Sequence, residues 1–154
     1  MDVSRLMPGN AATRDALLAA ARAAARHAYA TRSGVHVGAA VLSGAGRIYS
    51  GCNVENAAFP LGNCAEPAAI AAGVLAEGAL FRIAEVAVWA ETDDGEPFHI
   101  SPCGGCRQRI SELAPGSDVL VHFDWPGSGI STHSIGDLLP YAFRMDKVPG
   151  RRAP

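Results

Sequence analysis

Three cysteines place the strongest constraint on how this chain can fold. Cys64 is followed two positions later by Glu66, while Cys103 and Cys106 form a Cys-x-x-Cys pair directly after Pro102. Three thiolates can hold one zinc ion and leave its fourth coordination position open. We therefore expect residue 64 to lie beside residues 103 and 106 in the fold, although the two segments are far apart in the sequence.

The four cysteines could also serve in disulfides, in a redox motif or in a zinc ribbon. A zinc ribbon needs a second Cys-x-x-Cys pair, and the remaining cysteines, Cys52 and Cys64, are single. Two disulfides would need an oxidising compartment, yet residues 1–10 lack the basic and apolar regions of a signal peptide. A metal site in a cytoplasmic protein is therefore the favoured interpretation.

Glu66 distinguishes a catalytic metal site from a structural one. In a structural site, an acid in the first turn of a helix only interacts favourably with the helix dipole. In a catalytic site, a carboxylate beside a zinc-bound water can take up the water's proton and pass it on. An open zinc site with a glutamate that is not a ligand is typical of hydrolytic deamination of a nucleobase ring.

Length and charge restrict the kinds of partner. A chain of 154 residues is expected to form one domain, 1–154, with flexible ends at 1–10 and 148–154. The formal net charge of -2 offers no basic surface for a nucleic-acid polymer, so a small molecule is the expected substrate. No apolar run approaches the roughly 18 residues that a membrane span needs, so no membrane partner is expected.

Hydrophobic patterns predict strands that alternate with helices, which is typical of the α/β class. The segment 83–90 is mostly apolar and is expected to be a central buried strand. Glycines at 44 and 46 predict a hairpin turn between the first two strands. The expected helices are 10–30, 64–76, 104–113 and a short turn at 135–139; the expected strands are 36–42, 48–53, 83–90 and 119–123.

Three segments together resemble the short, homotetrameric, zinc-dependent cytidine deaminases of the cytidine/deoxycytidylate deaminase-like superfamily. They are residues 51–57 (GCNVENA), 60–66 (PLGNCAE) and 101–108 (SPCGGCRQ). The resemblance runs from about Ala16 to Phe143. It implies a three-layer α-β-α sandwich with a mixed central sheet of about five strands. It also implies deamination of cytidine or deoxycytidine to uridine or deoxyuridine and ammonia, in pyrimidine salvage.

The resemblance implies specific roles for the residues of the cysteine segments. Cys64, Cys103 and Cys106 would bind one Zn²⁺ per subunit, and Glu66 would be the general acid and base. The backbone of Ala65 would contact the amide edge of the pyrimidine.

The resemblance also implies where a pyrimidine nucleoside would bind. Asn53 and Glu55 match the positions that hydrogen-bond the ribose, chiefly its 3′-hydroxyl. Val35 stands where an aromatic ring often stacks near the base. Phe143 matches a phenylalanine that packs against a base bound in a neighbouring subunit, so a homotetramer with sites at subunit interfaces is expected.

Pro67 is a departure from the family, which usually has an arginine directly after the catalytic glutamate. That arginine hydrogen-bonds the ligand sulfurs and offsets their charge. Zinc with three thiolates leaves one net negative charge and a bound hydroxide makes two, of which two helix N-termini, at about half a positive charge each, offset only part. Arg107 and Arg109, both in the expected helix 104–113, are candidates for the missing cation. We expect zinc binding to persist, with an altered rate or pH optimum.

Val35 is a second departure and leaves other functions open. Losing an aromatic ring removes stacking of about 0.5–1.5 kcal/mol and leaves room for a bulkier base. The same chemistry could then act on a modified pyrimidine nucleoside or a nucleoside of the blasticidin type. A non-catalytic, zinc-stabilised nucleoside-binding protein, inactivated by Pro67, is a further alternative, although Glu66 argues against it.

Overall fold

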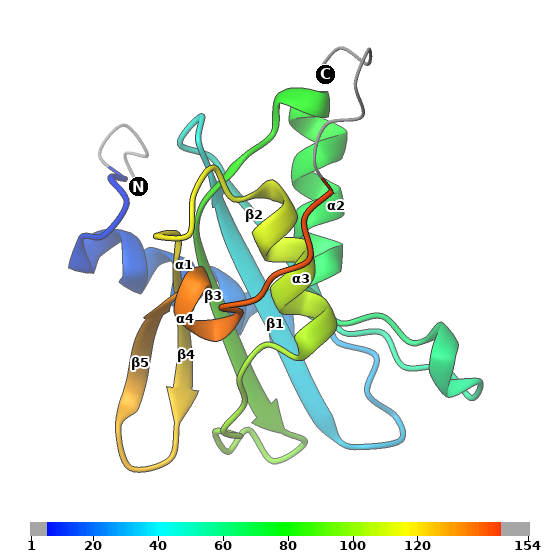
Figure 1. Cartoon of the computed structure of the whole chain (residues 1–154). Coiled ribbons are helices and arrows are strands. Elements are labelled where there is room, and N and C mark those ends of the chain that lie inside the picture. The colour runs from blue at the N-terminus through cyan, green and yellow to red at the C-terminus, as the bar shows by residue number, and fades with distance from the viewer. Residues whose placement is uncertain (1–5, 146–154) are drawn as a thin grey trace.

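A computed structural model describes residues 6–145, which form a mixed five-stranded sheet with helices on both of its faces (Figure 1). The strand order is β2-β1-β3-β4-β5; β3 and β4 are parallel, and the other neighbours are antiparallel. The strands are β1 (Val35–Ser43), β2 (Ile48–Cys52), β3 (Ile83–Thr92), β4 (Leu120–Trp125) and β5 (Gly129–Ser134). The predicted three-layer α-β-α sandwich is confirmed.

The helices divide between the two faces of the sheet. Figure 1 shows α1 (Ala11–Ala25) behind the sheet, and α2 (Ala65–Glu77) and α3 (Gly104–Leu113) in front of it. The short α4 (Ile135–Leu138) follows β5, and two 3-10 turns, η2 (Phe59–Leu61) and η3 (Gly78–Leu80), flank α2. Within residues 6–145, no helix is both long enough and apolar enough to span a bilayer.

Alternating side chains on the central strands produce two apolar layers. Successive residues of a strand point to opposite faces. Ala40 and Leu42 of β1 accordingly pack in the cluster that contains α1, while Ala39 and Val41 pack in the cluster that contains α2. Both faces of β1 and β3 are therefore buried, which explains why the sequence of β3 is almost continuously apolar.

Two glycines let helices approach the sheet closely. A Cβ atom on Gly38 would lie 1.9 Å from the carbonyl oxygen of Ala21 in α1. A Cβ atom on Gly51 would lie 2.4 Å from the backbone nitrogen of Ala69 in α2. Since real Cβ atoms do not approach backbone so closely, any side chain at these positions would push the helix away. Gly51 thus sets the height at which the start of α2 lies above β2.

Some boundaries differ from those expected. The first helix ends at Ala25, not near Ala30, because Tyr29 instead pairs with the segment after β2: its N–H donates to Asn53 O at 3.1 Å.

Strand β5 was not predicted; its sequence GISTHS is polar and half exposed, so it carries little apolar alternation. Residues 1–5 and 148–154, expected to be flexible, lie outside the described part of the chain, whereas Gly9 N donates to the buried Glu85 at 2.8 Å.

Replacing Gly51 with alanine should separate α2 from β2. We expect the Gly51→Ala variant to lose about 3 kcal/mol or more of its free energy of unfolding, because the new methyl group overlaps backbone that cannot rotate away. Urea unfolding of the zinc-loaded protein measures this loss. Gly44→Ala is the matched control, since its nearest contact would be at 3.9 Å. Equal stability of the two variants would contradict the close-packing argument.

Candidate active site

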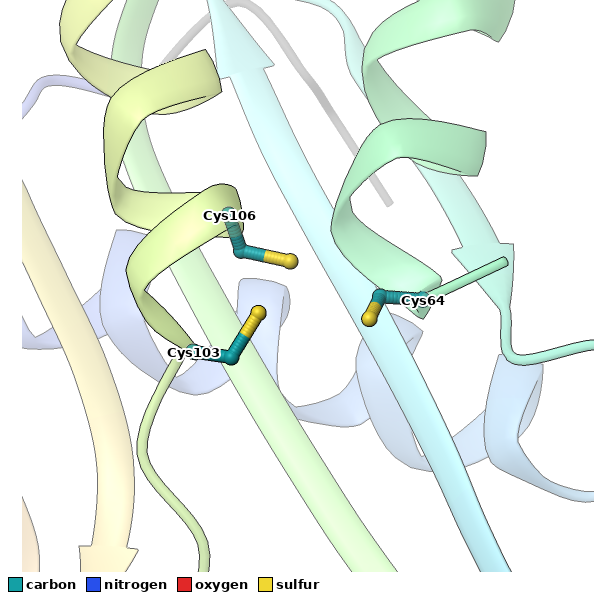
Figure 2. Close-up of side chains that lie close together, drawn as sticks. All are labelled: Cys64, Cys103 and Cys106. Carbon is teal, nitrogen blue, oxygen red and sulfur yellow. The ribbon is translucent and has the colours of Figure 1, made fainter. Parts of the chain in front are cut away.

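The three cysteines that the sequence pointed to come together at the starts of two helices. Cys64 is the N-cap residue of α2, Cys103 is the N-cap residue of α3, and Cys106 lies in the first turn of α3. Their sulfur atoms all lie within 4.8 Å of one another. Figure 2 shows the three side chains pointing toward one another from the two helices. The expected approach of residue 64 to residues 103 and 106 is therefore present.

This group of thiols suits zinc. Tetrahedral coordination with Zn–S bonds of about 2.3 Å places sulfurs about 3.8 Å apart, so only small side-chain shifts are needed. Neither N-cap cysteine uses its side chain to cap its helix, and both helix N-termini direct their positive dipole ends at the thiols. Among residues 6–145, no other three His, Cys, Asp or Glu side chains form such a group.

Cys64 and Cys106 lie close together and are chemically unequal. The neighbouring Cys106 thiol is the main cause of a lowered pKa at Cys64, about 6, while the proximity of Cys64 and burial raise the pKa of Cys106. Cys106 is fully buried, whereas Cys64 and Cys103 are exposed. One thiolate is thus available near neutral pH, beside the open side of the group.

Glu66 is buried beside the sulfurs, with only 3% of its surface exposed. The Cys106 thiol donates a hydrogen bond to its Oε2 atom at 3.2 Å. Burial raises the pKa of the Glu66 carboxyl; its own backbone N–H, the Cys106 thiol and the charge of Arg109 act in the opposite direction. A carboxyl in this position favours its protonated form more than an exposed glutamate does, so it can both accept and return a proton.

A cavity of about 320 Å³ opens beside Cys64. Cys64 and Ala65 line it from the start of α2, and Asn53 and Glu55 line it from the segment that follows β2. This volume is at the lower end of the range for small-molecule sites. Three of the residues expected to contact substrate, Asn53, Glu55 and Ala65, therefore share one cavity with a predicted metal ligand.

Asn53 and Glu55 also hold the loop before β1 in place. The Asn53 amide accepts from Val37 N at 2.8 Å and donates to Val35 O at 3.0 Å. The Glu55 carboxylate accepts from Arg32 N at 2.8 Å and from Ser33. The Ser33 hydroxyl is the main cause of a lowered pKa at Glu55, with Arg32 N–H adding to it. Both polar side chains are thus fixed in orientation before any ligand arrives.

Val35 and Phe143 are not among the residues that line this cavity within the described chain. Val37, two positions further along the same face of β1, lines it instead. The backbone of Phe143 is held by both ends of the Gln108 amide, at 3.1 and 2.8 Å, while its side chain is 69% exposed. Phe143 is therefore free to meet another molecule.

Three arginines lie near the site, and their positions in the sequence do not show which of them acts on the cysteine group. Arg32 lines the cavity but was not among the predicted site residues. Its position in the loop before the first strand was the only feature of the sequence that pointed to it. Arg107 donates to Pro102 O, Leu138 O and Ser101 Oγ at 2.8–3.1 Å, so it ties the start of α3 to its surroundings. The Arg109 side chain instead folds back over Gly105, so its guanidinium lies near the start of α3.

Comparison with known proteins agrees with this chemistry. The family model of the cytidine and deoxycytidylate deaminase zinc-binding region matches residues 12–122. The chain is 40% identical to a cytidine deaminase of Mycobacterium tuberculosis, over 84% of this chain and 88% of that protein. It is 38% identical to a cytidine deaminase of Sporosarcina psychrophila, over 86% of this chain and 92% of the relative.

A solved structure shows the same fold. The crystal structure of cytidine deaminase from Burkholderia pseudomallei matches with a TM-score of 0.70 and 42% identity, covering 84% of this chain and 98% of that one. Sequence, fold and the cysteine group thus agree. The chain belongs to the cytidine and deoxycytidylate deaminase family.

Proposed function

We propose that this protein is a zinc-dependent cytidine deaminase, which converts cytidine and deoxycytidine to uridine and deoxyuridine and releases ammonia. The observation that carries the proposal is the buried Glu66 carboxyl, 3.2 Å from a sulfur of the cysteine group. The relatives named as cytidine deaminases support the choice of substrate. The comparisons favour neither a modified nucleoside nor a purely binding role.

Each residue of the metal site has a distinct part in this reaction. Cys64, Cys103 and Cys106 would hold the zinc, which supplies an activated water at neutral pH when it is bound. Glu66 takes one proton from the attacking water and delivers it to the ring nitrogen of the pyrimidine; it then takes the second proton from the new C4 hydroxyl and delivers it to the departing amine, so that the carbonyl forms as ammonia leaves. Its raised pKa suits both directions of transfer.

The cavity gives the nucleoside an orientation. The base would enter toward Cys64 and Ala65, with the backbone of Ala65 at its amide edge, and the ribose would lie toward Asn53 and Glu55. Asn53 uses one of its two amide hydrogens for Val35 O, which leaves the other for a ribose hydroxyl. Glu55 can accept further bonds because an ionised carboxylate has about four acceptor positions.

We further propose a homotetramer in the cytoplasm. Phe59 and Leu61, near the cavity, are 77% and 72% exposed, and Phe143 is 69% exposed. Large apolar side chains at such exposure suit burial against other subunits, with the Phe143 ring of one subunit closing the cavity of the next. A reducing compartment is proposed because the three cysteines must remain reduced to bind metal as thiolates.

Glu66→Gln should greatly slow turnover without releasing zinc. The amide cannot transfer a proton, so we expect kcat to fall by about a hundredfold or more, while metal content stays at one zinc per chain. Loss of cytidine absorbance and release of ammonia measure the rate, and elemental analysis measures zinc. Glu112→Gln, on the exposed side of α3, is the control and should keep the wild-type rate. A Glu66→Gln enzyme with the wild-type rate would exclude Glu66 as the proton carrier.

Removal of one thiol should remove the metal. We expect Cys103→Ser to lose tightly bound zinc and all activity, because a neutral hydroxyl is a poor zinc ligand. Cys52→Ser is the matched control; Cys52 lies at the end of β2, outside the metal-binding group, and its variant should keep both zinc and activity. Chelation of wild-type zinc should likewise stop ammonia release, and added Zn²⁺ should restore it. Full activity of the metal-free protein would refute the proposal.

A further inference from the structure

Arg109 lies one helical turn after Cys106 on α3, and its guanidinium turns back toward the start of the helix. A Cβ atom on Gly105 would lie 3.1 Å from Arg109 Nη1 and 4.0 Å from Cys103 Sγ. The cation and the thiol therefore border the same small space, which is open because residue 105 has no side chain. Long side chains on a helix lie over the preceding turn, so this orientation follows from the sequence spacing.

The metal site needs a positive charge. One divalent ion with three thiolates carries one net negative charge, and a hydroxide would add a second. The N-termini of α2 and α3 contribute about half a positive charge each. Pro67, directly after Glu66 in the first turn of α2, contributes neither a charge nor an N–H group. With the hydroxide counted, about one negative charge is left unbalanced unless another side chain offsets it.

Of the nearby arginines, Arg109 is the one in position to do so. The Arg107 guanidinium is committed to three hydrogen bonds, with Pro102 O, Leu138 O and Ser101 Oγ. Arg32 lies at the Glu55 end of the cavity, where its charge acts on that carboxylate. Among the arginines within residues 6–145, Arg109 is the one whose charge acts on both Cys64 and Glu66.

We propose that Arg109 is a positioning residue of the zinc centre, whose guanidinium offsets the thiolate charge that Pro67 cannot offset. This inference rests on the proposed function and adds a residue to it. By drawing electron density toward itself, the guanidinium weakens donation from the sulfurs to the metal. The metal therefore remains electrophilic enough for the reaction.

A pair of variants separates the charge of Arg109 from its packing. Arg109→Met keeps an unbranched stem and removes the charge; Arg109→Lys keeps the charge. We expect Arg109→Met to lower kcat for cytidine about tenfold or more, with little change in KM, since the charge acts on the reaction and not on nucleoside binding. Arg109→Lys should keep most of the wild-type kcat.

The cobalt-substituted protein provides a readout that is independent of turnover. The thiolate-to-cobalt charge-transfer band should move to longer wavelength in Arg109→Met. Without the nearby cation the sulfur lone pairs lie at higher energy, so the transition needs less energy. The band should stay in place in Arg109→Lys. Adding Pro67→Arg to Arg109→Met should return both the band and kcat toward wild type. Arg14→Met, on α1 across the sheet, is the control and should change neither.

An unchanged band and kcat in Arg109→Met would overturn the inference. Equal effects of Arg109→Met and Arg109→Lys would overturn it as well, because they would show a packing role and not a charge role. A wild-type protein that releases no ammonia would refute the proposed function instead; the position of the cobalt band in Arg109→Met would still decide whether Arg109 acts on the metal centre.

Discussion

The meeting of two helix N-termini is the constraint on which the rest of this structure depends. Sulfurs from α2 and α3 can lie within 4.8 Å of one another only if both helices begin at the same place on one face of the sheet. Gly51 sets the depth of α2 by allowing backbone contact with β2. Arg107 sets the start of α3 through bonds to Pro102 O and Leu138 O. Residues that never contact substrate thus determine the shape of the metal site.

The same arrangement places Glu66 where a carboxyl is otherwise unfavourable. An ionised carboxylate buried to 3% exposure would be costly without partners. The Cys106 thiol, the backbone N–H at the helix start and the Arg109 charge supply partial compensation, but the pKa remains raised. A carboxylate whose charge was fully compensated would have too low a pKa to accept a proton readily. Incomplete compensation therefore serves the proton transfer proposed for this residue.

The chemistry of the cysteine segments made the centre of the site predictable. Three thiols in these spacings have few uses other than one metal ion, so the approach of Cys64 to Cys103 and Cys106 could be expected from the sequence alone. The apolar strand 83–90 was equally clear, because burial on both faces leaves a continuous signal. Strand β5 was not, since an edge strand with the sequence GISTHS needs only its neighbour β4 and little apolar surface.

The lining of the cavity depended on tertiary contacts and could not be predicted. Val35 and Val37 lie on the same face of β1, and which of them borders the cavity depends on the loop 31–34. That loop is held by hydrogen bonds from Arg32 and Ser33 to Glu55, far along the chain. Likewise, spacing alone left Arg107 and Arg109 equivalent. Only the three hydrogen bonds of Arg107 showed that it was already committed.

Pro67 and Arg109 have complementary effects on the metal site. A proline in the first turn of α2 gives up an N–H that would have no partner within the helix, so it costs no hydrogen bond. Its fixed φ also stiffens the turn that carries Glu66. The turn therefore gains rigidity at the price of a position that could have carried a cation. Arg109 on α3, whose charge acts on Cys64 and Glu66, can provide that charge without restoring flexibility to the turn. Helix α2 thus provides the rigidity around Glu66, and helix α3 provides the charge that compensates the thiolates.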